Sequence, residues 1–98
     1  MFARLTITQM KKDRLQEGIN LYKESVAPAV KAQKGFRGAY LLSDLESGKG
    51  ISISLWDSQD DAIENEKSGY YQEQVAKFKD IFSEAPVQEG YEVTVHVD

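Results

Sequence analysis

The feature that most constrains the fold is a β-hairpin predicted over residues 35–58. Residues 36–43 are rich in aromatic and aliphatic side chains, and residues 44–50 then collect Asp, Glu, Ser, Lys and Gly, which favour turns. Residues 51–56 alternate strictly between large apolar side chains and serines, ending at Trp56. Because side chains on a strand alternate between its two faces, this run predicts one apolar face and one mostly polar face.

Two more strands and a long helix are predicted around this hairpin. Strands are expected at residues 2–9 and 91–97, where β-branched or aromatic residues alternate with polar ones. Apolar residues at intervals of three and four predict a helix over residues 13–33. A kink or break is expected near residues 26–28, because Pro28 cannot donate a backbone hydrogen bond.

Two shorter helices are predicted between the hairpin and the last strand. Ser58 is a suitable N-cap for the first of them, and acidic residues follow in its first turn. This helix is expected to falter at residues 68–69. The second begins at Tyr70 or Tyr71 and runs to about residue 82.

The resulting order, β-α-β-β-α-β, predicts one α+β domain over residues 1–98 with a ferredoxin-like, four-stranded antiparallel sheet. The apolar sheet face, which includes Leu5 and Ile53, is expected to point at the helices. The other face would carry Trp56 with small polar or titratable side chains, namely Thr6, Thr8, Ser52, Ser54, Thr94 and His96. Such a face either meets solvent or packs against a second copy, forming a dimeric α+β barrel around a cavity. The dimer is favoured because it would cover Trp56.

The candidate functional residues each have a second interpretation. His96, the only histidine, is a candidate general base, or else a surface or interface residue. Trp56 is a candidate pocket wall that stacks on a planar ligand, or an interface aromatic. The threonines and serines of the polar face either bind a ligand or are hydrated. Tyr70 or Tyr71 is expected at the pocket mouth, with the other in the core. Arg4 either holds an anionic ligand group or forms a surface ion pair.

Composition excludes several classes of function. A net charge of −4 argues against nucleic-acid binding, which needs a basic face. There is no cysteine, which excludes disulfides and thiolate ligands, and one histidine with scattered carboxylates predicts no metal site. No apolar run approaches the roughly 20 residues that span a bilayer. A cytoplasmic protein without nucleic-acid or membrane partners is therefore expected.

Five short segments resemble the antibiotic biosynthesis monooxygenase-like family of dimeric α+β barrel proteins. They are GFRG at residues 35–38, ISLWDS at 53–58, DDA at 60–62, GYY at 69–71 and YEV at 91–93. The resemblance implies a homodimer whose two sheets face each other, with a small-molecule pocket in each subunit. Some members of that family oxidise polycyclic aromatic molecules with molecular oxygen and no cofactor, and others bind and degrade haem.

The haem-degrading relatives use an Asn in the first strand, a Trp at the end of the third and a His on the second helix. Trp56 matches the Trp, but residues 2–9 contain no Asn and the second helix contains no His. Haem degradation is therefore not expected, and no cofactor is predicted.

Three functional hypotheses follow. The first is a cytoplasmic homodimer that binds a planar or aromatic small molecule and oxidises it as a cofactor-independent monooxygenase. The second is a non-catalytic ligand-binding or stress-related dimer that uses the same sheet face. The third, isomerase or decarboxylase activity on a small lactone or acid, rests on shared architecture alone.

Overall fold

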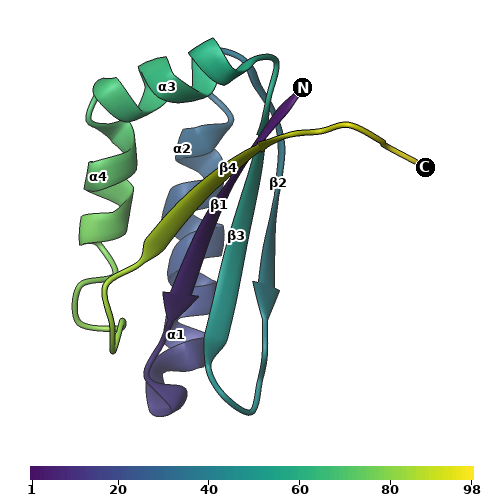
Figure 1. Cartoon of the computed structure of the whole chain (residues 1–98). Helices are drawn as coiled ribbons and strands as arrows, with labels where there is room; N and C mark the ends of the chain where they lie inside the picture. Colours follow the sequence, from purple (N-terminus) through teal and green to yellow (C-terminus); the bar gives the residue numbers. More distant parts are fainter.

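The computed structural model describes all 98 residues and contains one four-stranded antiparallel sheet in the order β2-β3-β1-β4. The helices cover one face of this sheet and leave the other open (Figure 1). The strands are β1 (Phe2–Gln9), β2 (Phe36–Ser43), β3 (Lys49–Trp56) and β4 (Val87–Glu92). This arrangement confirms the predicted ferredoxin-like α+β fold.

The first helical segment is continuous along the chain but irregular. Its parts are a 3₁₀ turn η1 (Lys12–Arg14), α1 (Leu15–Leu21), a π-helical stretch η2 (Tyr22–Val26) and α2 (Ala27–Val30). The predicted kink near residues 26–28 therefore takes the form of a π-helical stretch just before Pro28. A π-helical stretch is a common way for a helix to absorb a local irregularity.

The two later helices are α3 (Gln59–Lys67) and α4 (Tyr70–Ala76). Ser58 caps α3 as predicted, because its side-chain oxygen accepts a hydrogen bond of 3.2 Å from the backbone N–H of Asp61. Gly69, with φ of 88°, separates the two helices at the expected place. The second helix ends earlier than predicted, and turns follow it to residue 81.

The two sheet faces are arranged opposite to the prediction. The side chains that point at the helices come from the polar face, including Arg4, Thr8, Ser54 and Trp56, which are all buried. The apolar set, including Leu5 and Ile53, points to the open face. Alternation shows that two faces differ but does not say which one is covered. Here the helices supply the apolar side chains of the core themselves, so the covered face of the sheet can be polar.

The last strand begins and ends earlier than predicted. β4 pairs with β1 from Ile7 opposite Val87 to Phe2 opposite Glu92. Because β1 begins at Phe2, the pairing stops at Glu92, apart from one hydrogen bond of 2.9 Å from the Val93 N–H to the Met1 carbonyl. Residues 93–98 form no strand and extend away from the sheet, as Figure 1 shows.

The hydrophobic core consists of two separate clusters between the sheet and the helices. One is built on Met10, Leu15, Phe78 and Ile81, at the end where β1 finishes. The other is built on Val30, Trp56 and Ala62, at the opposite end of the sheet.

Candidate functional site

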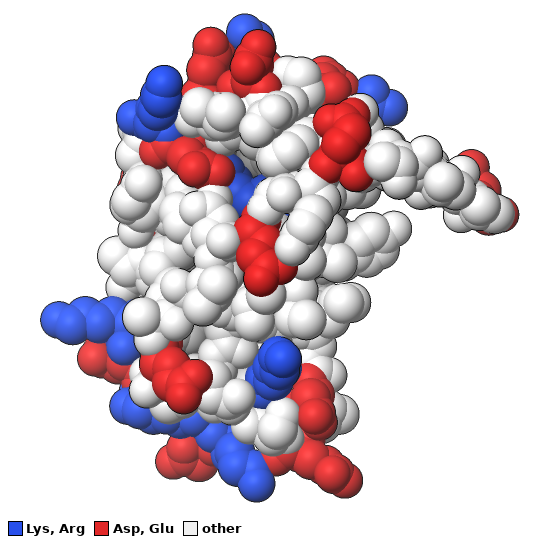
Figure 2. All heavy atoms as spheres, viewed as in Figure 1, with Lys and Arg blue, Asp and Glu red and all other residues white.

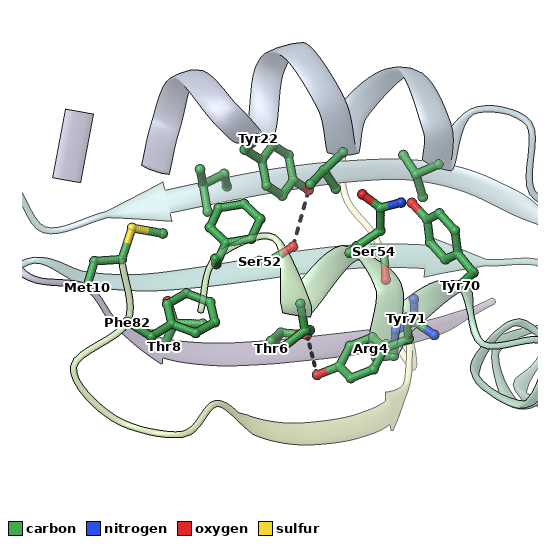
Figure 3. Close-up of a pocket in the computed structure, with 16 residues that line it drawn as sticks. Arg4, Thr6, Thr8, Met10, Tyr22, Ser52, Ser54, Tyr70, Tyr71 and Phe82 are labelled. Carbon is green, nitrogen blue, oxygen red and sulfur yellow. Dashed lines mark hydrogen bonds between the residues drawn. The ribbon is translucent and has the colours of Figure 1, made fainter. Parts of the chain in front are cut away.

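A cavity of about 80 Å³ lies between the covered face of the sheet and the helices (Figure 3). Its lining includes members of both core clusters, such as Met10 and Phe78 from one and Val30 from the other. The sheet contributes mainly hydroxyl groups, and the helices and the turn after α4 contribute mainly aliphatic and aromatic side chains. An apolar lining with a few polar groups is typical of sites for small organic molecules.

Five of the residues predicted to bind a ligand line this cavity. They are Thr6, Thr8, Ser52, Ser54 and Tyr70. Their role in binding stays a prediction, but one cavity contains all five. Trp56, Thr94 and His96 are not part of it.

Two tyrosines join the helices to the floor of the cavity. Thr6 Oγ1 donates a hydrogen bond of 3.3 Å to the hydroxyl of Tyr71 on α4. The hydroxyl groups of Tyr22 and Ser52 form a second hydrogen bond of 3.2 Å, visible as a dashed line in Figure 3. These bonds hold aromatic rings from the first and last helical segments over the hydroxyl groups of β1 and β3.

Arg4 lies at one end of the cavity and is almost wholly buried, with 5% of its surface exposed. Its partners on the adjacent strands are Ser54 on β3 and Gly90 on β4. The guanidinium lies between two aromatic rings, 4.9 Å from the ring centre of Trp56 and 5.0 Å from that of Tyr71. Both distances suit cation–π contacts.

Three groups from α3 partly compensate the charge of Arg4. Its guanidinium donates hydrogen bonds to Asn65 Oδ1 at 3.0 Å and to the Ala62 carbonyl at 3.4 Å. The nearest carboxylate oxygen, Oε1 of Glu66, is 3.6 Å from Nη1. Burial lowers the pKa of Arg4, and the neighbouring Glu66 opposes that effect. The interpretation of Arg4 as a surface ion pair is wrong, because the guanidinium is buried against α3.

Trp56 is fully buried within this single chain, so it is neither a cavity wall nor an exposed interface residue. Its indole N–H donates a hydrogen bond of 2.9 Å to Ser54 Oγ, and Phe36 meets its ring edge-on at 5.8 Å. The alternation had placed Trp56 correctly on the polar face, but that face is covered by helices. Trp56 contacts the guanidinium of Arg4 but does not itself line the cavity.

Tyr70 lines the same end of the cavity as Arg4 (Figure 3). Its hydroxyl is buried and has no hydrogen-bond partner. Burial raises the pKa of Tyr70 to about 12, although the nearby charge of Arg4 acts in the opposite direction. The hydroxyl therefore stays protonated at neutral pH and is available as a hydrogen-bond donor. Tyr71 also lines the cavity. Tyr70 packs against the core cluster of Val30, Trp56 and Ala62, so one of the pair does pack in the core as expected, although it lines the cavity as well.

His96 is mostly exposed on the extended segment after β4, where its Nε2 lies 3.1 Å from Oδ1 of Asp98. The predicted role as a general base required His96 to lie on a paired strand beside the polar face. Because β4 ends at Glu92, His96 and Thr94 lie beyond the sheet and do not approach the cavity.

Sequence reasoning missed most of the helical lining, including Tyr22, Gln74 and Phe78. Tyr22 belongs to the apolar stripe of the first helix, and a stripe of that kind normally indicates core packing only. Arg4 carried a usable signal, since it shares the alternating face of Thr6 and Thr8.

Comparison with known proteins assigns the chain to a family. The family model described as antibiotic biosynthesis monooxygenase matches residues 1–85. The chain belongs to the antibiotic biosynthesis monooxygenase family. Over 58 residues, or 59% of its length, it is 39% identical to an uncharacterised protein of Mycobacterium tuberculosis. That match spans about a quarter of the relative's own length, 26%.

Solved structures of distantly similar proteins share the fold. A Streptomyces coelicolor monooxygenase in complex with nanaomycin D superposes with a TM-score of 0.79 at 10% identity, covering 98% of this chain and 89% of that one. The heme-degrader MhuD of Mycobacterium tuberculosis, with two hemes bound, gives 0.75 at 14% identity over 100% of both chains. Identities this low establish the common fold alone.

Within this family member, the cavity offers donors but no acceptor of protons. None of its 16 lining side chains is Asp, Glu or His. It offers the hydroxyl groups of serine, threonine and tyrosine, one amide and the guanidinium of Arg4. Elsewhere, no helix is long and apolar enough to cross a membrane, and no group of three or more potential metal ligands occurs.

Proposed function

We propose that this family member is a homodimer that binds a small planar or aromatic molecule in the cavity and oxidises it as a cofactor-independent monooxygenase. The observation that carries the proposal is the cavity itself, which combines an aromatic and aliphatic helical wall with a hydroxyl-lined sheet. Family membership and the fold shared with a ligand-bound monooxygenase support it.

The volume of the cavity limits what can enter it. Pockets that enclose drug-sized ligands measure roughly 300–1,000 Å³, whereas this one measures about 80 Å³. A single ring is therefore the best match, and a ligand with three fused rings exceeds the volume of the cavity in this structure. A haem fits poorly, because the cavity is small and no histidine lines it.

The proposed reaction converts an activated ring methylene group into a carbonyl group. The substrate first loses one proton to give a carbanion, which transfers electrons to O₂ and forms a carbon–oxygen bond. One oxygen atom stays on the carbon as the carbonyl, and the other leaves as water with the two hydrogens of the methylene. The methylene carbon supplies the four electrons that O₂ accepts, so no external reductant is needed.

A non-catalytic ligand-binding protein is the second candidate, and one observation favours it. With no carboxylate or imidazole in the cavity, the protein itself does not remove the substrate proton. Catalysis then requires a substrate that is already ionised in water. A protein that only binds its ligand has no such requirement.

The open face of the sheet supports the proposed dimer. Side chains of β1, β2, β3 and β4 give it an apolar surface, on which Tyr40 and Leu42 are 62% and 48% exposed. Figure 2 views this side, and charged side chains gather mainly at its two ends. Exposed apolar patches of this kind usually mark an interaction site. The absence of cysteine supports the cytoplasmic location that we propose with the dimer.

Two probes with acidic ring methylene groups test the function. The purified protein is mixed with 1,3-cyclohexanedione, which has one ring, or anthrone, which has three, and O₂ uptake is followed with an electrode. Label from ¹⁸O₂ is then sought in the product by mass spectrometry. Uptake of one O₂ per carbonyl formed, with label in that carbonyl, is the expected result. Saturable binding without O₂ uptake would favour the second candidate, and no binding would reject both.

A further inference from the structure

We propose that the cavity takes its ligand as an anion, with the negative end held between the guanidinium of Arg4 and the hydroxyl of Tyr70. This inference rests on the proposed function, because it assumes that the cavity is a ligand site. To the proposed function it adds the charge of the ligand and the two residues that bind the charged group. The expected ligands are single-ring carboxylates, enolates or phenolates.

The burial of Arg4 is the first observation that points to an anion. A guanidinium removed from water needs close partners, since an uncompensated buried charge is costly. Arg4 has two hydrogen bonds to neutral oxygen atoms and one carboxylate at 3.6 Å, which is longer than a good charge-assisted hydrogen bond. Its planar fork matches two oxygen atoms of a carboxylate, and part of its surface lines the cavity.

Glu66 does not occupy the place that the ligand would take. Its side chain is 32% exposed and is not part of the cavity lining. The oxygen nearest to Arg4 also accepts a hydrogen bond of 2.6 Å from Gln88 on β4. Glu66 therefore approaches the guanidinium from outside, and the side of Arg4 that faces the cavity remains available.

The hydroxyl of Tyr70 is the second and independent observation. Buried polar groups are almost always hydrogen-bonded, so a buried hydroxyl without a partner needs an explanation. This hydroxyl belongs to a side chain that lines the cavity at the end where Arg4 lies (Figure 3). A ligand oxygen there would satisfy it, and a negatively charged oxygen would form the stronger bond.

The chemistry of the remaining lining agrees with both observations. No acidic side chain lines the cavity to repel an anion. No carboxylate or imidazole lines it to act as a general base and generate the anion from a neutral ligand. A ligand that arrives ionised meets one buried cation and one free donor at the same end.

Benzoate and benzamide are a matched pair of probes, because they are nearly equal in size and differ in charge. The single tryptophan, Trp56, lies 4.9 Å from Arg4, so its fluorescence reports directly on this end of the cavity. Binding is measured by titrating each probe into the full chain and following tryptophan emission, with calorimetry as a second readout. Benzoate is expected to bind at least tenfold more tightly than benzamide.

Two variants identify the residues responsible. Arg4→Gln should abolish the preference for benzoate, but it also alters the core, so its folding must be checked by circular dichroism. Tyr70→Phe removes only a hydroxyl that has no partner in the free protein, and it should weaken benzoate binding about tenfold. Tyr40→Phe on the open face is the matched control and should change neither affinity.

The outcomes separate this inference from the proposed function. Tighter benzoate binding that falls in Tyr70→Phe supports the anion site. Equal binding of the two probes, or a Tyr70→Phe variant with unchanged benzoate affinity, overturns the anion site and leaves the cavity as a ligand site. Binding of neither probe overturns the anion site together with the proposed function for single-ring ligands.

Discussion

The guanidinium of Arg4 lies 4.9 Å from the ring centre of Trp56, and the indole beneath it is fully buried. The indole N–H is in turn bonded to Ser54, so a chain of contacts leads from the cavity into the core. A change at any of the three residues should therefore affect both stability and the position of the charge.

Ser54→Ala should lower the free energy of unfolding by about 1–3 kcal/mol, because it leaves the buried indole N–H of Trp56 without an acceptor. Urea unfolding measures the effect. Ser43→Ala is the control, since it removes a serine hydroxyl from the same sheet face for which the structure shows no hydrogen bond. Equal losses in the two variants would mean that the indole bond contributes little.

Tyr70→Phe and Tyr71→Phe should differ in stability although each removes one hydroxyl. Tyr70 loses an unsatisfied group, so its variant should be as stable as the parent chain or slightly more stable. Tyr71 loses its hydrogen bond with Thr6, which should cost about 0.5–1.5 kcal/mol. Thermal unfolding compares them, and a larger loss in Tyr70→Phe would contradict the assignment of its hydroxyl as unpaired.

Glu66→Gln should lower stability and raise the affinity for benzoate. The loss should be smaller than the roughly 3–5 kcal/mol seen when a fully buried ion pair is broken, because Glu66 is partly exposed. The gain in affinity follows from removing a negative charge a few ångströms from the proposed anion site. Glu64→Gln, on the exposed side of α3, is the control and should leave benzoate affinity unchanged.

The pKa of Tyr70, about 12 against an ordinary value of 10, predicts an alkaline effect. The folded protein holds this proton more tightly than the unfolded chain does. The contribution of Tyr70 to stability is therefore fully present below pH 10 and is lost as the pH rises toward 12. Tyrosinate absorbance should show a component near pH 12 that Tyr70→Phe lacks. If the component that Tyr70→Phe removes instead titrates near pH 10, burial does not raise the pKa of Tyr70.

Leu42→Lys should convert the proposed dimer to a monomer, because it places a charge within the apolar open face. Light scattering gives the mass of the parent and variant. Leu45→Lys adds the same charge at an exposed position in the turn between β2 and β3, and it should leave the mass unchanged. A monomeric parent chain would refute the dimer at once.

The order of elements could be predicted from the sequence because local patterns determine it. The alternation in residues 51–56, the Ser58 cap and the interruption at Gly69 each depend on neighbouring residues, and each occurs where it was expected. Four cavity residues, Thr6, Thr8, Ser52 and Ser54, could also be grouped correctly, because strand alternation places them on one face whichever way that face points.

The rest depends on contacts between distant segments. The end of β4 is determined by where β1 begins, which no pattern in residues 87–97 reveals, and His96 was misplaced for this reason. The direction of the polar face depends on Arg4 finding partners on α3, 58 and 61 positions away. Polar side chains on a strand normally mark the face that is exposed to solvent, whereas here they lie on the face that the helices cover.

The separation of the hydrophobic core into two clusters also affects how the chain unfolds. Without a ligand, Met10 and Phe78 belong to one cluster and Trp56 to the other, with the cavity between them. A ring bound in the cavity would touch side chains of both clusters and join them into one continuous interior. The two clusters would then unfold more cooperatively in the complex than in the free protein, because the ligand completes the packing between them.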